Sequence, residues 1–218
     1  REIRRINPPE DETPMHAAYR CFGLFPDQTM LYGHLRLSED GRVQGQLPLP
    51  RGLWDAAVNE SGEVAAATPW LYLVDATGRC ILSNVAPAKL VGGNWIGFGF
   101  CGDNIFVAKD GDLFVVSRNG EVVGTLAVPD DPQAFSSRPV QRVVSDVKGF
   151  VYVLVGDKVQ IFDPKLRWLH SLSPVNGLRA VTIDPTGVLY LTTFQYTIKL
   201  VPQDGGVWAL AEKKKSQP

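Results

Sequence analysis

Residues capable of chemistry are spread thinly along this sequence of 218 residues. The histidines His16, His34 and His170 are far apart. The DGD segment at 110–112 offers two carboxylates, but a calcium site needs more oxygen ligands, and a solvated turn explains the pattern as well. The sequence contains no GxSxG, P-loop or HExxH motif. We therefore predict no catalytic residue, no bound metal and no cofactor.

Aromatic and basic residues in predicted loops offer binding chemistry instead. Aromatic side chains in such loops can anchor a partner peptide or stack on bases, or they can cap the core between repeats. Basic and acidic residues are nearly balanced in these loops, which suits a protein partner better than a phosphate backbone. The predicted partner-binding residues are Trp70, Lys109, Phe135, Arg138, Lys158, Arg179, Phe194 and Tyr196.

The two ends of the chain carry the densest positive charge. Arg4 and Arg5 lie near the start, and Lys213, Lys214 and Lys215 lie near the end. If the ends meet, these residues form one patch that could bind RNA through phosphate contacts, independently of base sequence. The alternative is a solvated tail that aids solubility.

The elements that must position these residues are short strands in a repeat. Polar turns followed by apolar runs are centred at Gly41, Gly78, Gly120, Lys165 and Gly206, an interval of 37 to 45 residues. A second series of turns, centred at Gly62, Asn104, Gly149 and Gly187, precedes four of them. Each repeat therefore has the order strand, turn, strand, loop, strand, turn, strand, which is typical of a β-propeller blade.

The sequence thus predicts an all-β propeller of five blades, or of six with one degenerate blade. Residues 1–16 form a polar lead-in, residues 17–211 form a single propeller domain, and residues 212–218 form a basic disordered tail. An unpaired strand at either end would leave an open sheet edge. We therefore expect the N-terminal REIRRI segment to pair with the first or last blade and to close the ring.

Composition excludes several classes of protein. The net charge is −1, so the surface as a whole is not built to grip nucleic acid. The sequence contains no run of about 18 apolar residues, the length that a membrane-spanning helix needs. Three cysteines without a CxxC pair suit a reducing compartment, with buried or inert thiols as the ordinary explanation. The start at REIRR, without Met, leads us to expect a domain from a longer protein.

The segments DVKGFVYVLVGDKVQIFD and DPTGVLYLTT resemble NHL repeats, in which a DxxG turn leads into a VYV strand. The chain departs from that pattern where an Asp usually follows the second strand, because Leu154 and Thr193 lie near those places. NHL domains occur at the C-termini of tripartite-motif ubiquitin ligases. The resemblance implies a cytoplasmic antiviral ligase of innate immunity, whose RING domain carries the catalysis. This domain would then recruit protein substrates or adaptors, or alternatively RNA.

Overall fold

The computed structural model describes residues 22–86, 90, 95–109, 112–129, 131, 134–135, 140–184, 186–202 and 208–215. These residues contain twenty strands and no α-helix. The first two groups of four strands are β1 (Phe22–Leu24), β2 (Met30–Tyr32), β3 (Leu35–Leu37), β4 (Val43–Gln46), β5 (Asp55–Val58), β6 (Val64–Ala67), β7 (Leu71–Val74) and β8 (Cys80–Val85). The next two groups are β9 (Trp95–Cys101), β10 (Asn104–Lys109), β11 (Asp112–Val116), β12 (Val122–Leu126), β13 (Val140–Ser145), β14 (Val151–Val155), β15 (Lys158–Phe162) and β16 (Trp168–Leu172). The last group is β17 (Ala180–Ile183), β18 (Leu189–Thr192), β19 (Tyr196–Pro202) and β20 (Trp208–Lys215).

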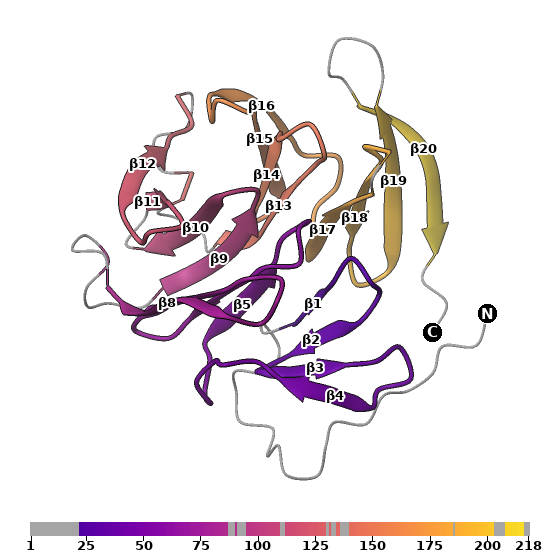
Figure 1. Cartoon of the computed structure of the whole chain (residues 1–218). Coiled ribbons are helices and arrows are strands. Elements are labelled where there is room, and N and C mark those ends of the chain that lie inside the picture. The colour runs from indigo at the N-terminus through magenta and orange to yellow at the C-terminus, as the bar shows by residue number, and fades with distance from the viewer. Residues whose placement is uncertain are drawn as a thin grey trace.

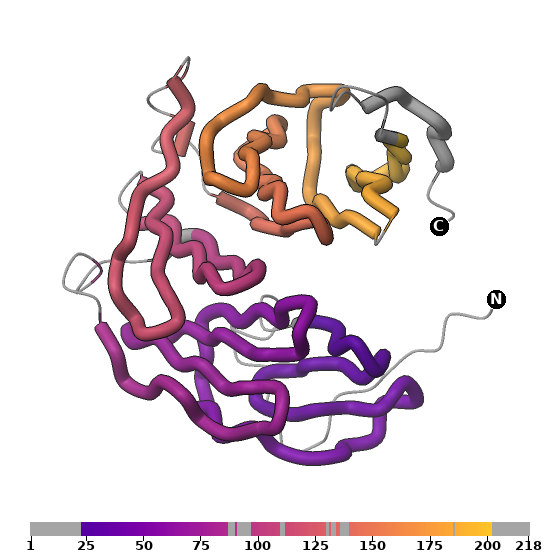
Figure 2. The backbone as a smooth tube through the Cα atoms, turned by 45° about the horizontal axis from the view of Figure 1, so that its top comes forward, coloured from indigo at the N-terminus to yellow at the C-terminus, as the bar shows by residue number. Residues whose placement is uncertain are grey.

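Each consecutive group of four strands forms one antiparallel sheet, in the order of the sequence. The five sheets stand around a common centre, as Figure 1 and the turned view in Figure 2 show. The first strand of each sheet lies innermost. This arrangement is a five-bladed β-propeller, which confirms the predicted fold. We number the blades 1 to 5 along the chain.

The repeated polar turns have a common hydrogen-bond pattern. In blade 5, the Oδ1 atom of Asp184 accepts hydrogen bonds from the backbone amides of Thr186 (2.9 Å) and Val188 (3.0 Å). Gly187 stands between them with a φ of 84°, a left-handed conformation that glycine adopts without steric cost. Asp75, Asp146, Asp163 and Asn59 accept the equivalent amide hydrogens in their own turns. A polar acceptor three residues before a glycine therefore specifies most of these turns.

Two predicted turn centres are shifted. In the turn that starts at Asp163, the left-handed residue is Leu166 (φ 61°), one position after the predicted Lys165. A non-glycine residue is strained there, but Leu166 also packs against the core between blades 3 and 4. In blade 3, Cys101 pairs directly with Asn104, so Gly102 and Asp103 form a two-residue turn. The spacing of the repeats predicted that both turns exist, but it did not predict which residue lies at the centre of each turn.

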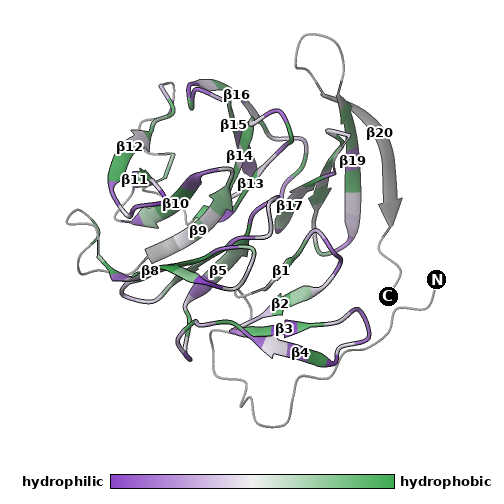
Figure 3. Cartoon of the chain, in the orientation of Figure 1, coloured by the Kyte–Doolittle hydropathy of each residue, from purple (hydrophilic) through white to green (hydrophobic). Residues whose placement is uncertain are grey.

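The core is divided into apolar layers between neighbouring blades. Alternate residues of a strand face opposite sides of a sheet. In blade 4, Val151 and Val153 therefore pack toward blade 3, whereas Tyr152 and Leu154 pack toward blade 5. Similar clusters join blade 1 to blade 2 and blade 2 to blade 3. Figure 3 shows the matching pattern of hydrophobic strands and hydrophilic turns.

The outward faces of the first and last blades differ from these layers. The face of blade 1 that points away from blade 2 carries a separate apolar cluster of Met30, Tyr32, Leu35 and Leu37. The face of blade 5 that points away from blade 4 carries Tyr190 and the pair Thr192 and Thr197, whose hydroxyls lie 3.3 Å apart. Among the described residues, no hydrophobic cluster joins blade 5 to blade 1.

The chain ends relate to the predictions in two ways. The REIRRI segment, which we expect to close the ring, lies outside the described residues. At the other end, β20 runs through Lys215 and pairs with β19. Residues 212–215 therefore lie in a strand, where we expected a disordered tail from residue 212. The strand pairing supplies partners for their backbone, which composition alone did not indicate.

Candidate functional site

The loops that carry the candidate residues lie at one end of the blades. Because the strands are antiparallel, the loop after the second strand of each blade and the connection to the next blade are at the same end. We call this end the top face. Among the described residues it includes 33–34, 47–54, 68–70, 156–157, 173–179 and 193–195. The repeated turns lie on the opposite end, the turn face.

Threonine side chains hold two of the top-face loops in a fixed shape. In blade 2, the hydroxyl of Thr68 accepts a hydrogen bond from the amide of Trp70 (3.1 Å). In blade 5, the hydroxyl of Thr193 accepts hydrogen bonds from the amides of Gln195 (3.2 Å) and Tyr196 (3.1 Å). Both threonines are buried, so the loops are fastened to the blades beneath them. In blade 2 the aromatic residue Trp70 lies two positions after Thr68, and in blade 5 Phe194 lies directly after Thr193.

Among the described residues, three large apolar side chains are exposed on the top face. Trp54 is 39% exposed, Trp70 is 44% exposed and Phe194 is 78% exposed. The amide of Trp54 donates to the carbonyl of Ala67, which places Trp54 at the entrance to the inner strand of blade 2. Trp54 was not among the predicted partner-binding residues, because the loops that were searched for aromatic residues did not include it. The signal that could have found it is its position one residue before the inner strand of blade 2.

Arg179 occupies the corresponding position in blade 5. Its amide donates to the carbonyl of Thr192 (2.8 Å), and its guanidinium carbon lies 4.4 Å from the centre of the Phe194 ring. This is a cation–π contact on an exposed ring. The two predicted residues are therefore brought together as one unit on the top face.

The other predicted partner-binding residues are placed less favourably. Lys158 is 47% exposed and pairs with Asp131 at 3.7 Å, and Tyr196 is half-buried against the core between blades 4 and 5. Phe135 is only 4% exposed and packs in the core between blades 3 and 4, which is the core-capping alternative given for the loop aromatics. Lys109, at the end of β10, is 6% exposed and is likewise withdrawn from the surface. Arg138 lies outside the described residues.

The predicted RNA-binding residues are only partly described. Arg4 and Arg5 lie outside the described residues. Lys213, Lys214 and Lys215 are in β20, in register with Ile198, Thr197 and Tyr196. The RNA-binding patch stays a prediction.

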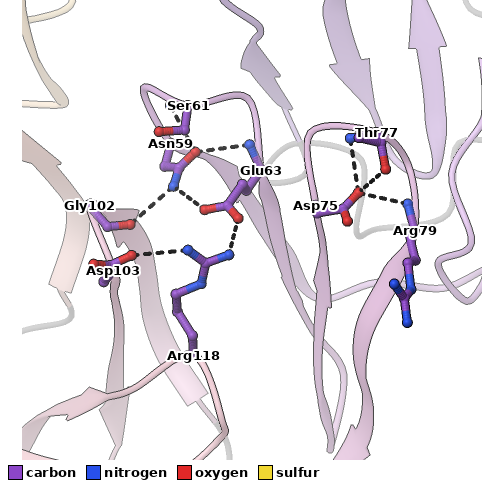
Figure 4. A network of polar contacts seen from close by, with 9 residues as sticks. All are labelled: Asn59, Ser61, Glu63, Asp75, Thr77, Arg79, Gly102, Asp103 and Arg118. Atoms are coloured by element: carbon purple, nitrogen blue, oxygen red, sulfur yellow. Dashed lines mark hydrogen bonds and ion pairs between the residues drawn. The ribbon is translucent and has the colours of Figure 1, made fainter.

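A polar network on the turn face joins blades 2 and 3 (Figure 4). Asn59 donates to Glu63 Oε2 (2.9 Å) and to the carbonyl of Gly102 (3.0 Å). Arg118, from blade 3, pairs with Glu63 and also lies 3.1 Å from Asp103. Glu63 is buried, and its carboxylate is therefore compensated by a cation and an amide. The network stabilises the contact between two blades.

A pocket of about 430 Å³ lies beside this network, with Glu60, Asp75 and Asp103 in its wall. The pKa of Asp75 is lowered, mainly by the hydrogen bond from the Thr77 hydroxyl and next by the amide of Arg79. A carboxylate with a lowered pKa stays ionised at neutral pH, so it cannot act as a general acid there. The described residues contain no group of three or more His, Cys, Asp or Glu side chains that could hold a metal ion.

The remaining candidates for chemistry are scattered in the structure as well. His170 lies in β16, and burial lowers its pKa. His34 is buried at the top of blade 1, and His16 lies outside the described residues. Asp112 begins β11, whereas Asp110 is not described. In the part of the chain that the structure describes, no helix is long and apolar enough to cross a membrane.

Comparisons with known proteins identify the fold and not a family. No family model matches the sequence, and no curated protein matches it. Virginiamycin B lyase from Staphylococcus aureus is similar in structure, with a TM-score of 0.59 and 12% identity over 91% of this chain and 71% of that one. BBS1N, in a complex with ARL6DN, has a TM-score of 0.57 and 13% identity over 79% of this chain and 60% of that one. An extracellular domain from B. thetaiotaomicron has a TM-score of 0.57 and 12% identity over 84% of this chain.

The chain has the β-propeller fold. It spans only 27% of the B. thetaiotaomicron domain. At sequence identities of 12–13%, structural similarity indicates a shared fold but not a shared function. Nothing in the comparisons links the chain to tripartite-motif ligases, so the NHL resemblance is supported only as far as the propeller.

Proposed function

We propose that this domain is a non-catalytic binding module that recruits a protein partner through its top face. The observation that carries the proposal is the exposure of Trp54, Trp70 and Phe194 on that face. Exposed aromatic residues held on a rigid scaffold are the usual anchors of protein interfaces, because they bury much area at little cost in side-chain entropy.

The structural neighbours are compatible with this function. BBS1N was solved in a complex with ARL6DN, so a chain of similar fold binds another protein. Virginiamycin B lyase is named as an enzyme, but the candidate acids of the present chain are scattered or engaged in structural pairs. A binding module therefore explains the described residues better than an active site.

The more specific predictions have no support from the structure or the comparisons. The role in a tripartite-motif ubiquitin ligase, the antiviral activity and the cytoplasmic location derive from the sequence resemblance alone. RNA binding through the basic ends derives from composition alone. These stay predictions, and the top-face function does not depend on them.

A matched set of variants tests the proposal. The triple variant Trp54→Ala, Trp70→Ala, Phe194→Ala removes the exposed aromatic residues of the top face. Val123→Ala and Val147→Ala remove apolar side chains with 59% and 71% exposure elsewhere, and serve as controls. We expect partner recovery in quantitative co-purification to fall by about tenfold or more for the triple variant, since interface anchors are worth about 2 kcal/mol or more each.

The controls should recover the same partners as the wild-type chain. Thermal unfolding should show that every variant is folded. Unchanged recovery by the triple variant, or a loss confined to the control variants, would place the interface elsewhere and refute the proposal.

A further inference from the structure

The contact between Arg179 and Phe194 defines a more specific site on the top face. The guanidinium lies over the ring, at 4.4 Å from its centre. A stacked guanidinium keeps its N–H donors in the plane of the group, where they remain available to an acceptor. Among the described residues, no carboxylate forms an ion pair with Arg179 and no acceptor takes a hydrogen bond from its side chain.

This condition separates Arg179 from four of the described arginines, whereas Arg51, also exposed on the top face, has neither an ion pair nor a cation–π contact among the described residues. Arg36, Arg42, Arg118 and Arg167 each pair with a carboxylate of Asp27, Asp40, Glu63 or Asp163. Arg179 is exposed and lies on an aromatic ring instead. The hydrogen-bond donors of the Arg179 guanidinium therefore have no acceptor among the described residues.

The backbone around this unit is fixed. Asp157 Oδ1 accepts hydrogen bonds from the amides of Gly177 (2.7 Å) and Leu178 (3.0 Å), directly before Arg179. The Thr193 hydroxyl fixes the loop that carries Phe194. Both halves of the unit are thus held before any ligand arrives, which lowers the entropic cost of binding.

We propose that the Arg179–Phe194 unit binds a carboxylate side chain of an acidic peptide segment. The carboxylate would accept two parallel hydrogen bonds from the guanidinium, and an adjacent apolar residue of the peptide would cover the open part of the Phe194 ring. Phe194 is 78% exposed, so the ring has surface left beside the guanidinium. This inference rests on the proposed function and names the partner chemistry for the same face.

A peptide carboxylate fits the surroundings better than RNA does. A phosphate backbone is bound by several cations together. Lys158, the other predicted basic residue described on the top face at an exposed position, pairs with Asp131 at 3.7 Å. The Arg179 guanidinium beside the exposed Phe194 ring is suited to one acidic residue with an apolar neighbour.

The test uses the 218-residue chain and a phage-displayed library of random peptides about twelve residues long. Selected peptides should be enriched in Asp and Glu next to apolar residues. Fluorescence anisotropy then measures the affinity of the selected peptides for the wild type and for Arg179→Ala, Arg179→Lys, Phe194→Ala and Trp70→Ala. Arg179→Ala should weaken binding about tenfold or more, and Arg179→Lys should weaken it less, because lysine keeps the charge without the planar fork.

Each other outcome has a definite meaning. Selected peptides without acidic enrichment, or affinities unchanged by Arg179→Ala, overturn this inference. If such peptides are nevertheless weakened by Trp70→Ala, the top-face function stands without it. If no peptide is selected, or none responds to a top-face variant, both proposals fail. A single-stranded oligouridylate that binds through Arg179 and displaces the peptides would overturn the assignment in favour of RNA.

Discussion

The two described cysteines show how strongly burial controls the reactivity of a thiol. Burial raises the pKa of Cys101 to about 12, whereas Cys80 is exposed in β8. Only the thiolate reacts with alkylating reagents. We expect iodoacetamide at pH 7.5 to modify Cys80 quickly and Cys101 very slowly in the native protein, as measured by peptide mass mapping. The rate at Cys101 should stay low up to about pH 10 and should rise when the protein is unfolded. Equal rates in the native state would contradict its burial.

The turn aspartates give the protein a defined sensitivity to acid. The hydrogen bond from the Thr186 hydroxyl, followed by amide hydrogen bonds, holds the pKa of Asp184 below its usual value of 3.8. A lowered folded-state pKa adds stability above the unfolded-state pKa, and this stability is lost as the pH falls through the folded-state pKa. The same direction holds for Asp75 and Asp163. The urea concentration at the midpoint of unfolding should therefore decrease as the pH is lowered from about 4.5 to about 2.5.

The variant Asp184→Asn removes the titratable carboxylate but keeps an oxygen that can accept the backbone hydrogen bonds of the turn. The amide oxygen can still accept from the backbone, as Asn59 does in its own turn. We expect this variant to stay folded at pH 7 and to show a shallower loss of stability in acid than the wild type. Asp184→Ala should also lower stability at pH 7, because it removes the acceptor. An unchanged acid slope in Asp184→Asn would remove Asp184 from the explanation.

At the scale of elements, blades 2 and 3 are joined by the pair of Glu63 and Arg118. Arg118→Ala leaves a buried carboxylate with only its amide partner. Because Arg118 is 40% exposed, we expect a discounted loss of about 1–3 kcal/mol in the free energy of unfolding. Adding Glu63→Gln to Arg118→Ala should recover part of that loss. The exposed Lys148→Ala in a blade 4 turn is the control. A loss no larger than that of the control would show that the pair is worth little.

The elements were largely predictable from the sequence, and their exact registers were not. The turn acceptors and glycines marked where strands begin and end, because those residues satisfy the turn backbone themselves. Leu166 broke this signal, since tertiary packing supports a residue that local preference disfavours. Lys213 to Lys215 read as a tail, because their strand is specified by pairing with β19 and not by their own composition.

The candidate site was predictable only in part, for a similar reason. Phe194 and Arg179 were identified from their positions in loops. Phe135 was a candidate for partner binding and lies in the core, while Trp54 was not a candidate and is exposed. Loop position indicates which end of a blade a residue occupies, but only three-dimensional packing decides whether its side chain is covered.

At the scale of the molecule, the two sides of a blade are not equivalent in the last repeat. Leu154 of blade 4 and Thr192 of blade 5 occupy corresponding positions, but Leu154 is fully buried and Thr192 is half-buried. Leu154→Thr should lower the free energy of unfolding by about 2–4 kcal/mol, since it removes apolar contacts and buries a hydroxyl. Thr192→Leu should change it by less than about 0.5 kcal/mol. Urea unfolding measures both, and similar effects would mean that blade 5 is covered like blade 4.

Because each described blade consists of four strands in sequence order, β20 is both the outermost strand of blade 5 and the last of the described strands. Its only described strand partner is β19. A mechanical force that pulls Lys215 away from β19 would therefore peel β20 from its neighbour, rupturing the hydrogen bonds successively and not all at once. Such unzipping requires little force at any moment. The last strand would yield first under tension while the inner strands of the ring kept their shape.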